Sequence, residues 1–209
     1  MATQAKLKTY IQELSYEKRI CRSLNNEASA RPLNWGKLLE SYVFTREELL
    51  GFEYRQNSDK VIEHPTIKHW CGTPDGTKDN TVFDLKCPWT MKSFCELEQI
   101  TILQDIEYFK NEKPEYYWQL VSNSILTNSQ FAELIVYCPY EANLTDIRIF
   151  AENYDGLDQY KYRFIVESSN DELPYLPEES PCIDLNIFRF EVPQSDKDLL
   201  ISKISSIEI

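Results

Sequence analysis

The sequence of 209 residues lacks several features that mark common protein classes. It contains no Cys-x-x-Cys pair and only two histidines, His64 and His69, which excludes a structural zinc site of the usual ligand spacing. No apolar run approaches the length of a membrane span, and the first residues do not form a signal peptide. We therefore expect a cytoplasmic protein with no membrane partner, whose six scattered cysteines are free thiols: Cys21, Cys71, Cys87, Cys95, Cys138 and Cys182.

The chain also lacks an excess of positive charge. Its 22 Lys and Arg residues face 34 Asp and Glu residues, which gives a net charge of −12. Such a charge opposes nucleic-acid binding, because that affinity rests largely on the neutralisation of phosphates. The distribution is uneven, however: residues 1–31 carry a net charge of +3, and residues 141–209 carry −9. Local positive potential is therefore expected near the N-terminus, while the acidic C-terminal part faces outward.

What the chain does contain is a turn followed by a strand that together carry two acids and a lysine. The run Cys71–Gly76 reads Cys-Gly-Thr-Pro-Asp-Gly, in which proline and glycine favour a tight turn around Asp75. After a spacer of eight residues counted from Gly76, Asp84 opens the run Asp-Leu-Lys-Cys-Pro. Side chains alternate along a strand, so Asp84 and Lys86 share one face. If the turn and the strand pair as a hairpin, Asp75 approaches Asp84.

These residues suit a metal-dependent phosphodiesterase. Asp75, Asp84 and the backbone carbonyl of Leu85 form an all-oxygen set, which hard cations such as Mg²⁺ prefer. A bound Mg²⁺ lowers the pKa of its water, and Lys86 would orient or deprotonate that water or balance the phosphate charge. The alternative is a solvated strand face, because 27% of the residues are charged and an acid–x–lysine triplet arises readily by chance.

The full pattern resembles the PD-(D/E)xK nuclease superfamily, and within it the lambda exonuclease (YqaJ-type viral recombinase) family. The resemblance rests on three blocks in the family's order, which span about residues 33–139. They are Trp35-Gly36-Lys37-Leu38-Leu39-Glu40, then Pro74-Asp75-Gly76 with Asp84-Leu85-Lys86-Cys87-Pro88, and finally Tyr116-Tyr117-Trp118-Gln119-Leu120.

The resemblance implies an α/β fold with a restriction-endonuclease-like core, a central mixed β-sheet flanked by helices. It implies that Glu40 completes a Mg²⁺ site in which Mn²⁺ can substitute, and that Gln119 faces the active site. Lys37, Arg31 and Arg22 become the candidate DNA-binding residues.

The implied activity is that of a phage-recombination exonuclease, which resects one strand of double-stranded DNA from an end in the 5′ to 3′ direction. Its implied partners are double-stranded DNA ends, a single-strand annealing protein and two further copies in a homotrimer ring. Its implied location is the cytoplasm of a bacterium or of a phage-infected host.

The chain departs from the family's pattern in ways that leave alternatives open. Val121 stands where the family often has a second glutamine, and Asp84 stands where many relatives have glutamate. The segment before the first block is short, and Ala28-Ser29-Ala30-Arg31 is at best a remnant of the family's 5′-phosphate grip. A restriction or structure-selective endonuclease therefore remains an alternative, as does a non-catalytic DNA-binding module that keeps the fold. The intact acid and lysine set argues against the module.

The remaining pattern predicts one α/β domain with a core at 33–139, an inserted hairpin or helix at 143–181, and a closing strand and helix at 182–209. Helices are predicted at 6–24, 33–50, 91–110, 114–127 and 194–206, with Asn34 and Ser195 as N-caps. Strands are predicted at 52–56, 61–64, 67–71, 81–87, 131–137 and 183–192, with 81–87 and 131–137 parallel because a helical crossover joins them. Four tryptophans are candidates either for the core, which is the commoner role, or for stacking on bases: Trp35, Trp70, Trp89 and Trp118.

Overall fold

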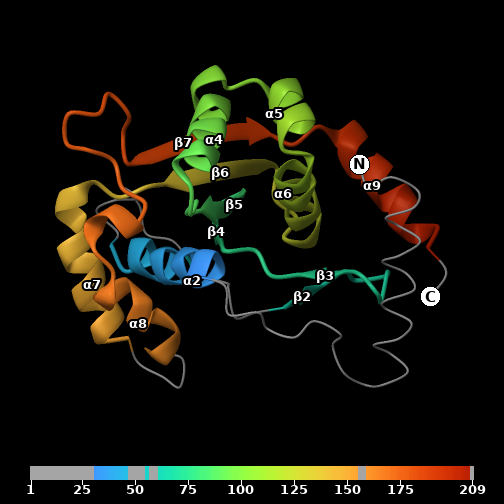
Figure 1. The fold of residues 1–209 in the computed structure, drawn as a ribbon. Helices are drawn as coiled ribbons and strands as arrows, with labels where there is room; N and C mark the ends of the chain where they lie inside the picture. The colour runs from blue at the N-terminus through green and yellow to red at the C-terminus, as the bar shows by residue number, and fades with distance from the viewer. Residues whose placement is uncertain (1–30, 47–54, 57–60, 155–158, 208–209) are drawn as a thin grey trace.

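A mixed β-sheet with helices on both faces forms the centre of the protein in a computed structural model (Figure 1). The structure describes residues 31–46, 55–56, 61–154 and 159–207. The sheet has the strand order β1-β4-β5-β6-β7. Its strands are β1 (Arg55–Gln56), β4 (Gly76–Lys78), β5 (Thr81–Lys86), β6 (Phe131–Tyr137) and β7 (Leu185–Glu191). A separate antiparallel pair contains β2 (Ile62–Glu63) and β3 (Cys71–Gly72).

The pairing of β5 with β4 and β6 shows how far each of these two strands extends along β5. β5 pairs in parallel with β6, from Thr81 opposite Phe131 to Lys86 opposite Val136. On its other side β5 pairs antiparallel with β4, where Gly76 lies opposite Phe83. β4 therefore stops short of the end of β5, which leaves that end free of a strand partner on one side. The predicted parallel pair and the predicted mixed sheet are both confirmed.

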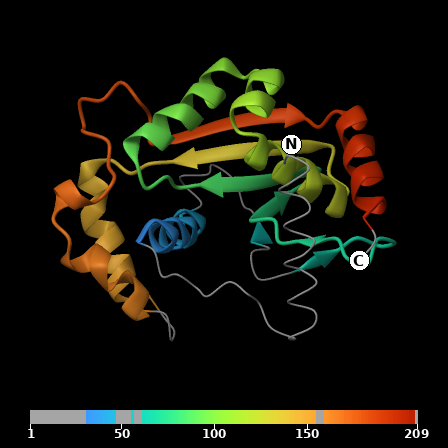
Figure 2. The ribbon, with the colours of Figure 1, turned by 45° about the vertical axis from the view of Figure 1, so that its right-hand side comes forward.

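Helices cover both faces of the sheet. Between β5 and β6 the chain forms α4 (Met91–Leu103), α5 (Ile106–Glu112) and α6 (Pro114–Leu126), which lie on one side of the sheet (Figures 1 and 2). The other side carries α2 (Arg31–Phe44), α7 (Leu144–Glu152) and α8 (Gln159–Glu167). Helix α9 (Gln194–Ser205) follows β7 and packs against α6, and two short 3₁₀ turns span Glu141–Asn143 and Asn170–Glu172.

Each face has its own apolar core. Phe83 and Leu85 of β5 pack with α2, α7 and α8, whereas Val82 packs on the opposite face with α4, α5 and α6. This is the alternation that a strand buried on both faces requires. The largest fully buried side chains are distributed over both cores: Trp35, Tyr42, Phe83 and Tyr137 on the α2 side, and Phe94, Phe109 and Tyr117 on the α6 side.

Helix α2 confirms the predicted apolar stripe but corrects its predicted start. Asn34 was expected to cap the helix, yet it lies inside α2, and its side-chain amide donates to the Lys161 carbonyl of α8 at 3.2 Å. The contact with α8 explains the polar residue at this buried position. The helix ends at Phe44, short of the predicted residue 50. The predicted stripe is buried: Trp35, Leu38, Leu39, Tyr42 and Val43.

Three further predicted elements differ from the structure. The predicted helix 91–110 is two helices, because Gln104 adopts a left-handed conformation (φ 50°) and Asp105 caps α5 through the amides of Glu107 and Tyr108. The predicted strand 67–71 begins only at Cys71, since the His64 ring accepts backbone amides of Thr66 and Ile67 in a turn. Ser195 does not cap α9, which starts at Gln194 directly after Pro193.

Other predictions agree with the structure or lie outside its described part. Helix α6 starts at Pro114 as expected, since proline suits the first helical position. Residues 143–181 contain the helices α7 and α8, and both helices contact α2. The predicted helix 6–24 and most of the predicted strand 52–56 lie outside the described residues. Over the described part of the chain, no helix has the length and apolar character needed to cross a membrane.

Candidate active site

Strand β5 directs Asp84 and Lys86 toward helix α6. Asp84 is completely buried, and the Lys86 side chain is 21% exposed, so the pair sits at the boundary between core and solvent. The Lys86 Nζ lies 2.6 Å from Oδ2 of Asp84. Burial acts to lower the pKa of Lys86, but the adjacent Asp84 outweighs it and raises that pKa above its usual value. Lys86 is therefore a cation at neutral pH.

The Asp84 carboxylate is poorly satisfied for a group with no solvent contact. Within the described residues neither of its oxygens accepts a hydrogen bond of good geometry, and Lys86 supplies only an ion contact. Burial raises the pKa of Asp84 above its usual value, while the charge of Lys86 and the contacts with Lys86 and Asp75 oppose that rise. A fully buried carboxylate with so few donors is costly, so this site has unused capacity to bind a cation or a proton.

Asp75 reaches the free edge of β5 from the turn before β4. Its Oδ2 accepts the backbone amide of Leu85 at 2.7 Å. The register explains this contact: Gly76 pairs with Phe83, so the next amide that faces this edge belongs to Leu85 and has no strand partner there. The carbonyl of a strand residue points to the same edge as its amide, which directs the Leu85 carbonyl toward Asp75 as well.

The charge around Asp75 is strongly negative. Burial, Asp84 and Glu40 together raise the pKa of Asp75 from 3.8 to about 8, against the opposing effect of its hydrogen bond from Leu85. Among the described residues, the charges that act on Asp75 are therefore those of two further acids, Asp84 and Glu40, and of one cation, Lys86. Such mutual repulsion is relieved either by a proton or by a bound metal ion.

Helix α2 brings Glu40 to this region from the other side of the sheet. Gly36 lies one turn before Glu40, and a Cβ atom at Gly36 would stand 3.8 Å from the Cys87 carbonyl. The helix thus passes close to the end of β5, and the half-buried Glu40 raises the pKa values of both Asp75 and Cys87. Glu40 lies off the buried apolar stripe of α2, and its role at the metal site stays a prediction.

Helix α6 contributes two side chains to Lys86. Gln119 accepts a hydrogen bond from Lys86 Nζ through Oε1 at 3.4 Å. The ring of Tyr116 lies one turn earlier, with its centroid 4.8 Å from the same nitrogen. Tyr116 was not singled out as a site residue. Its position three residues before Gln119 places both on one helix face, which is the signal that could have identified it.

The donor set fits the expected metal ion in its chemistry. Asp75, Asp84, the Leu85 carbonyl and Glu40 supply oxygen ligands of the kind that Mg²⁺ binds, and the unsatisfied Asp84 oxygens indicate spare coordinating capacity. The arrangement of these ligands is looser than their chemistry. In the part of the chain that the structure describes, no three His, Cys, Asp or Glu side chains are arranged to hold one metal ion. The two aspartates and the carbonyl therefore form the centre of the site, with Glu40 at its margin.

Two of the three expected DNA-binding residues, Arg31 and Lys37, lie in the described part of the chain. Arg31 and Lys37 are exposed on α2, and neither has a carboxylate within ion-pair distance among the described residues. The Arg31 guanidinium lies 5.5 Å from the ring centroid of Phe164 on α8. Arg22 lies outside the described residues.

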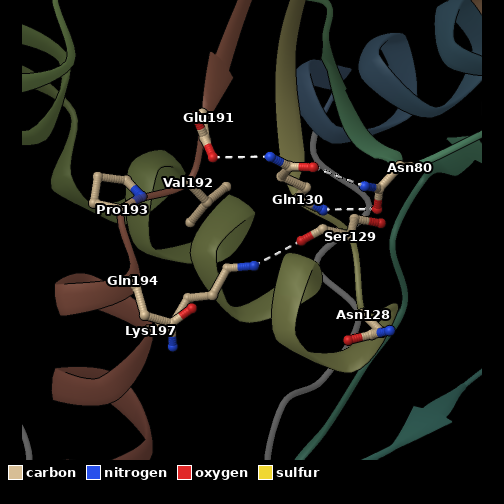
Figure 3. Close-up of a pocket in the computed structure, with 9 residues that line it drawn as sticks. All are labelled: Asn80, Asn128, Ser129, Gln130, Glu191, Val192, Pro193, Gln194 and Lys197. Carbon is tan, nitrogen blue, oxygen red and sulfur yellow. Dashed lines mark hydrogen bonds between the residues drawn. The ribbon is translucent and has the colours of Figure 1, made fainter.

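A large open hollow lies at the opposite end of the strands, beside the starts of β5 and β6 and the end of β7 (Figure 3). Its volume is about 620 Å³, and its lining includes Asn80 just before β5 and Glu191 at the end of β7. Its polar groups mostly bind one another: Asn80 and Gln130 exchange two hydrogen bonds, and Lys197 donates to the Ser129 carbonyl at 2.7 Å. It contains none of the residues expected at the active site: along the strand, Asp84 lies about 13 Å and Lys86 about 20 Å from Asn80.

The sequence matches no protein-family model and no curated protein. The structure, in contrast, is similar to solved exonucleases. An alkaline exonuclease (LHK-Exo) from Laribacter hongkongensis has a TM-score of 0.58 at 19% identity, over 99% of this chain and 77% of that one. The same protein in complex with dAMP gives 0.56 at 18% identity, over 95% of this chain and 76% of that one. A phage related exonuclease from Haemophilus somnus 129PT gives 0.59 at 14% identity, over 95% and 77%. The chain thus has the α/β fold of these exonucleases, with its mixed sheet flanked by helices.

Proposed function

We propose that the protein is a metal-dependent DNA exonuclease of the phage recombination type, which resects one strand of double-stranded DNA from an end in the 5′ to 3′ direction. The observation that carries the proposal is the convergence of Asp75, Asp84, Lys86 and Gln119 at the free end of β5. These residues come from a turn, a strand and a helix, yet their functional groups meet at one place. The fold shared with known exonucleases supports the same conclusion.

Each residue has a role that follows from its contacts. Asp75, Asp84, the Leu85 carbonyl and Glu40 would hold Mg²⁺, or Mn²⁺ in its place, and the ion would activate a water and offset phosphate charge. Lys86 keeps its positive charge beside Asp84, so it orients the attacking water and stabilises negative charge on the phosphate rather than accepting a proton. Gln119 and Tyr116 fix the direction of the Lys86 ammonium.

The raised pKa of Asp75 predicts an alkaline optimum. A metal ligand must be ionised, and Asp75 loses its proton only near pH 8 when no cation is bound. Activity should therefore rise from neutral to alkaline pH. The Laribacter protein is described as an alkaline exonuclease, which agrees with this expectation for the present chain.

The wider context is proposed on the same basis. The substrate is a double-stranded DNA end, and the product is a 3′ single-stranded tail that a single-strand annealing protein receives. The acting assembly is a homotrimer ring in the cytoplasm of a bacterium or a phage-infected host. A ring that encloses DNA requires positive potential only on its inner face, which reconciles DNA binding with a net charge of −12.

The test is cleavage of linear and circular duplex DNA with Mg²⁺ by the wild type and by Asp84→Ala, Lys86→Ala and Lys92→Ala. Lys92 is the matched control, since its side chain is 87% exposed on α4. We expect degradation of the linear form alone, lost in the first two variants and kept in the third. Cleavage of the circle would identify an endonuclease instead. Absence of cleavage of either form would identify a non-catalytic module.

A further inference from the structure

Trp89 lies directly beside the proposed active site. It follows Lys86 by three residues, so the chain allows at most about 10 Å between their backbones. It also precedes Thr90, whose hydroxyl caps α4 by accepting the Ser93 amide at 3.1 Å. Trp35 and Trp70 are buried, with exposed fractions of 0% and 5%, and belong to the core as expected. Trp89 and Trp118 are half-buried, and of these two Trp89 is the one that follows directly on the strand of Asp84 and Lys86.

Aromatic contacts hold the Trp89 ring in place. It meets Trp35 edge to face at a centroid distance of 5.9 Å and Phe164 at 6.0 Å, with interplanar angles of 72° and 69°. The Arg31 guanidinium lies over the other partner, Phe164. Trp89, Phe164 and Arg31 thus form a continuous half-exposed surface, which we call the Trp89 ledge. An aromatic ring that is already ordered loses little conformational freedom when a ligand stacks on it.

The charge beside the ledge suits a phosphate backbone. Surface arginines elsewhere in the described residues pair with acids, as Arg46 does with Asp146 and Arg163 with Glu167. Arg31 and Lys37, in contrast, have no such partner there. Both lie on α2, the helix that also carries Glu40. Two unpaired cations on one helix of an acidic protein favour an anionic ligand.

Trp89 and Lys86 lie close enough along the chain for one nucleic-acid strand to reach both. Three residues allow at most about 10 Å between their backbones, which is no more than about three steps of 3.4 Å along a DNA strand. A strand whose phosphate lies at the acids and Lys86 would therefore bring a nearby base within reach of the ledge.

We propose that the Trp89 ledge is a stacking subsite for a base one or two nucleotides from the reacting phosphate, with Arg31 and Lys37 contacting the adjoining phosphates. The inference rests on the proposed function, because it takes the reacting phosphate to lie at Asp84 and Lys86. It makes Trp89 a substrate-binding residue that reads no particular sequence, since every base offers an aromatic face.

The test compares two forked duplexes that carry the same charge. One has tails of thymidine, and the other has tails of abasic residues. Binding is measured by fluorescence anisotropy in EDTA at one fixed salt concentration, so that no cleavage occurs. The proteins are the wild type, Trp89→Leu, Trp89→Phe and Tyr160→Ala. The leucine keeps apolar bulk against Trp35, the phenylalanine keeps a ring, and Tyr160 is a surface aromatic of α8 with an exposed fraction of 70%. Thermal melts report whether each variant is folded.

We expect Trp89→Leu to bind the thymidine fork about 5- to 100-fold more weakly than the wild type, and the abasic fork equally well. Trp89→Phe should recover most of the loss, and Tyr160→Ala should bind like the wild type. Equal losses on both forks, or no loss on the thymidine fork, would overturn the stacking role while leaving the proposed function intact. A wild-type protein that bound neither fork would overturn both the stacking role and the proposed function.

Discussion

Protons and a divalent cation should compete for Asp75, and this competition can be measured without any nuclease assay. Burial and the neighbouring acids raise the pKa of Asp75 from 3.8 to about 8, so the carboxyl holds a proton at neutral pH when no metal is bound. A cation must displace that proton before it can use the oxygens. For one displaced proton, the apparent affinity falls about tenfold for each pH unit below 8. Between pH 8 and pH 6 the predicted loss is about a hundredfold.

The same shift determines how stability depends on pH. The folded state binds the Asp75 proton more tightly than the unfolded state does, so its stabilising effect is present at low pH. That effect is lost as the pH rises from about 4 to about 8. Added Mg²⁺ restores stability by an amount that grows with the logarithm of its free concentration relative to its Kd. The rise in melting temperature caused by Mg²⁺ should therefore be small at pH 6, large at pH 8, and constant above that.

The assay is thermal unfolding with Mg²⁺ titrated at pH 6, 7, 8 and 9. Asp75→Asn keeps an oxygen for the Leu85 amide but removes the charge, so its metal-free form should be more stable than the wild type at pH 8 and should show little response to Mg²⁺. Asp146→Asn is the matched control, because Asp146 pairs with Arg46 on the surface. An Mg²⁺ response of the wild type that does not vary between pH 6 and pH 8 would refute the reasoning.

Three further variants test the surroundings of the site. Tyr116→Phe should keep the cleavage rate, whereas Tyr116→Leu should lower it about 2- to 30-fold, because only the leucine removes the ring beside Lys86; single-turnover rates distinguish them. Asp196→Ala should destabilise the protein by about 3 kcal/mol in urea unfolding, since it leaves Lys110 and the buried Tyr117 hydroxyl unpaired, and a variant with unchanged stability would contradict the assigned contacts. Phe109→Ala should cost about 3–5 kcal/mol by the same method, because that ring is fully buried among aromatics. A loss below about 1 kcal/mol would contradict that packing.

Local signals account for the parts of the fold that the sequence predicts well. The alternation along 81–86 reflects a strand whose two faces meet different cores, and the proline at position 114 marks a helix start. The parallel pairing of β5 and β6 follows from the helical crossover between them. Each of these depends on residues close in sequence, or on one connection of known type.

The misplaced features have two causes, which are contacts between distant segments and local signals that compete with one another. Asn34 has the composition of a cap, but the Lys161 carbonyl 127 residues away gives its amide a partner inside the helix. The break at Gln104 is locally encoded by the Asp105 cap, yet the apolar pattern runs across it and favours a single helix. In such cases a short-range signal is correct in kind and wrong in position.

The candidate site shows the same division. Asp84 and Lys86 are placed together by the period of one strand, so their pairing follows from the sequence. The hydrogen bond from Leu85 to Asp75 requires the register of β4, and the ring of Tyr116 beside Lys86 requires the packing of α6 on β5. The raised pKa of Asp75 results from burial and from acids on two other elements, Asp84 on β5 and Glu40 on α2, which no single motif contains.

The central claim is that the carboxylate of Asp84 serves phosphodiester hydrolysis. Its most direct test is the single-turnover rate at which Asp84→Asn degrades an end-labelled linear duplex with Mg²⁺ at pH 8, beside Asp146→Asn and the wild type. Asparagine has nearly the same shape but no charge, so the fold should persist, which a thermal melt verifies. The account predicts a rate at least about a hundredfold below that of the wild type for Asp84→Asn and an unchanged rate for Asp146→Asn. A wild-type rate in Asp84→Asn would contradict it.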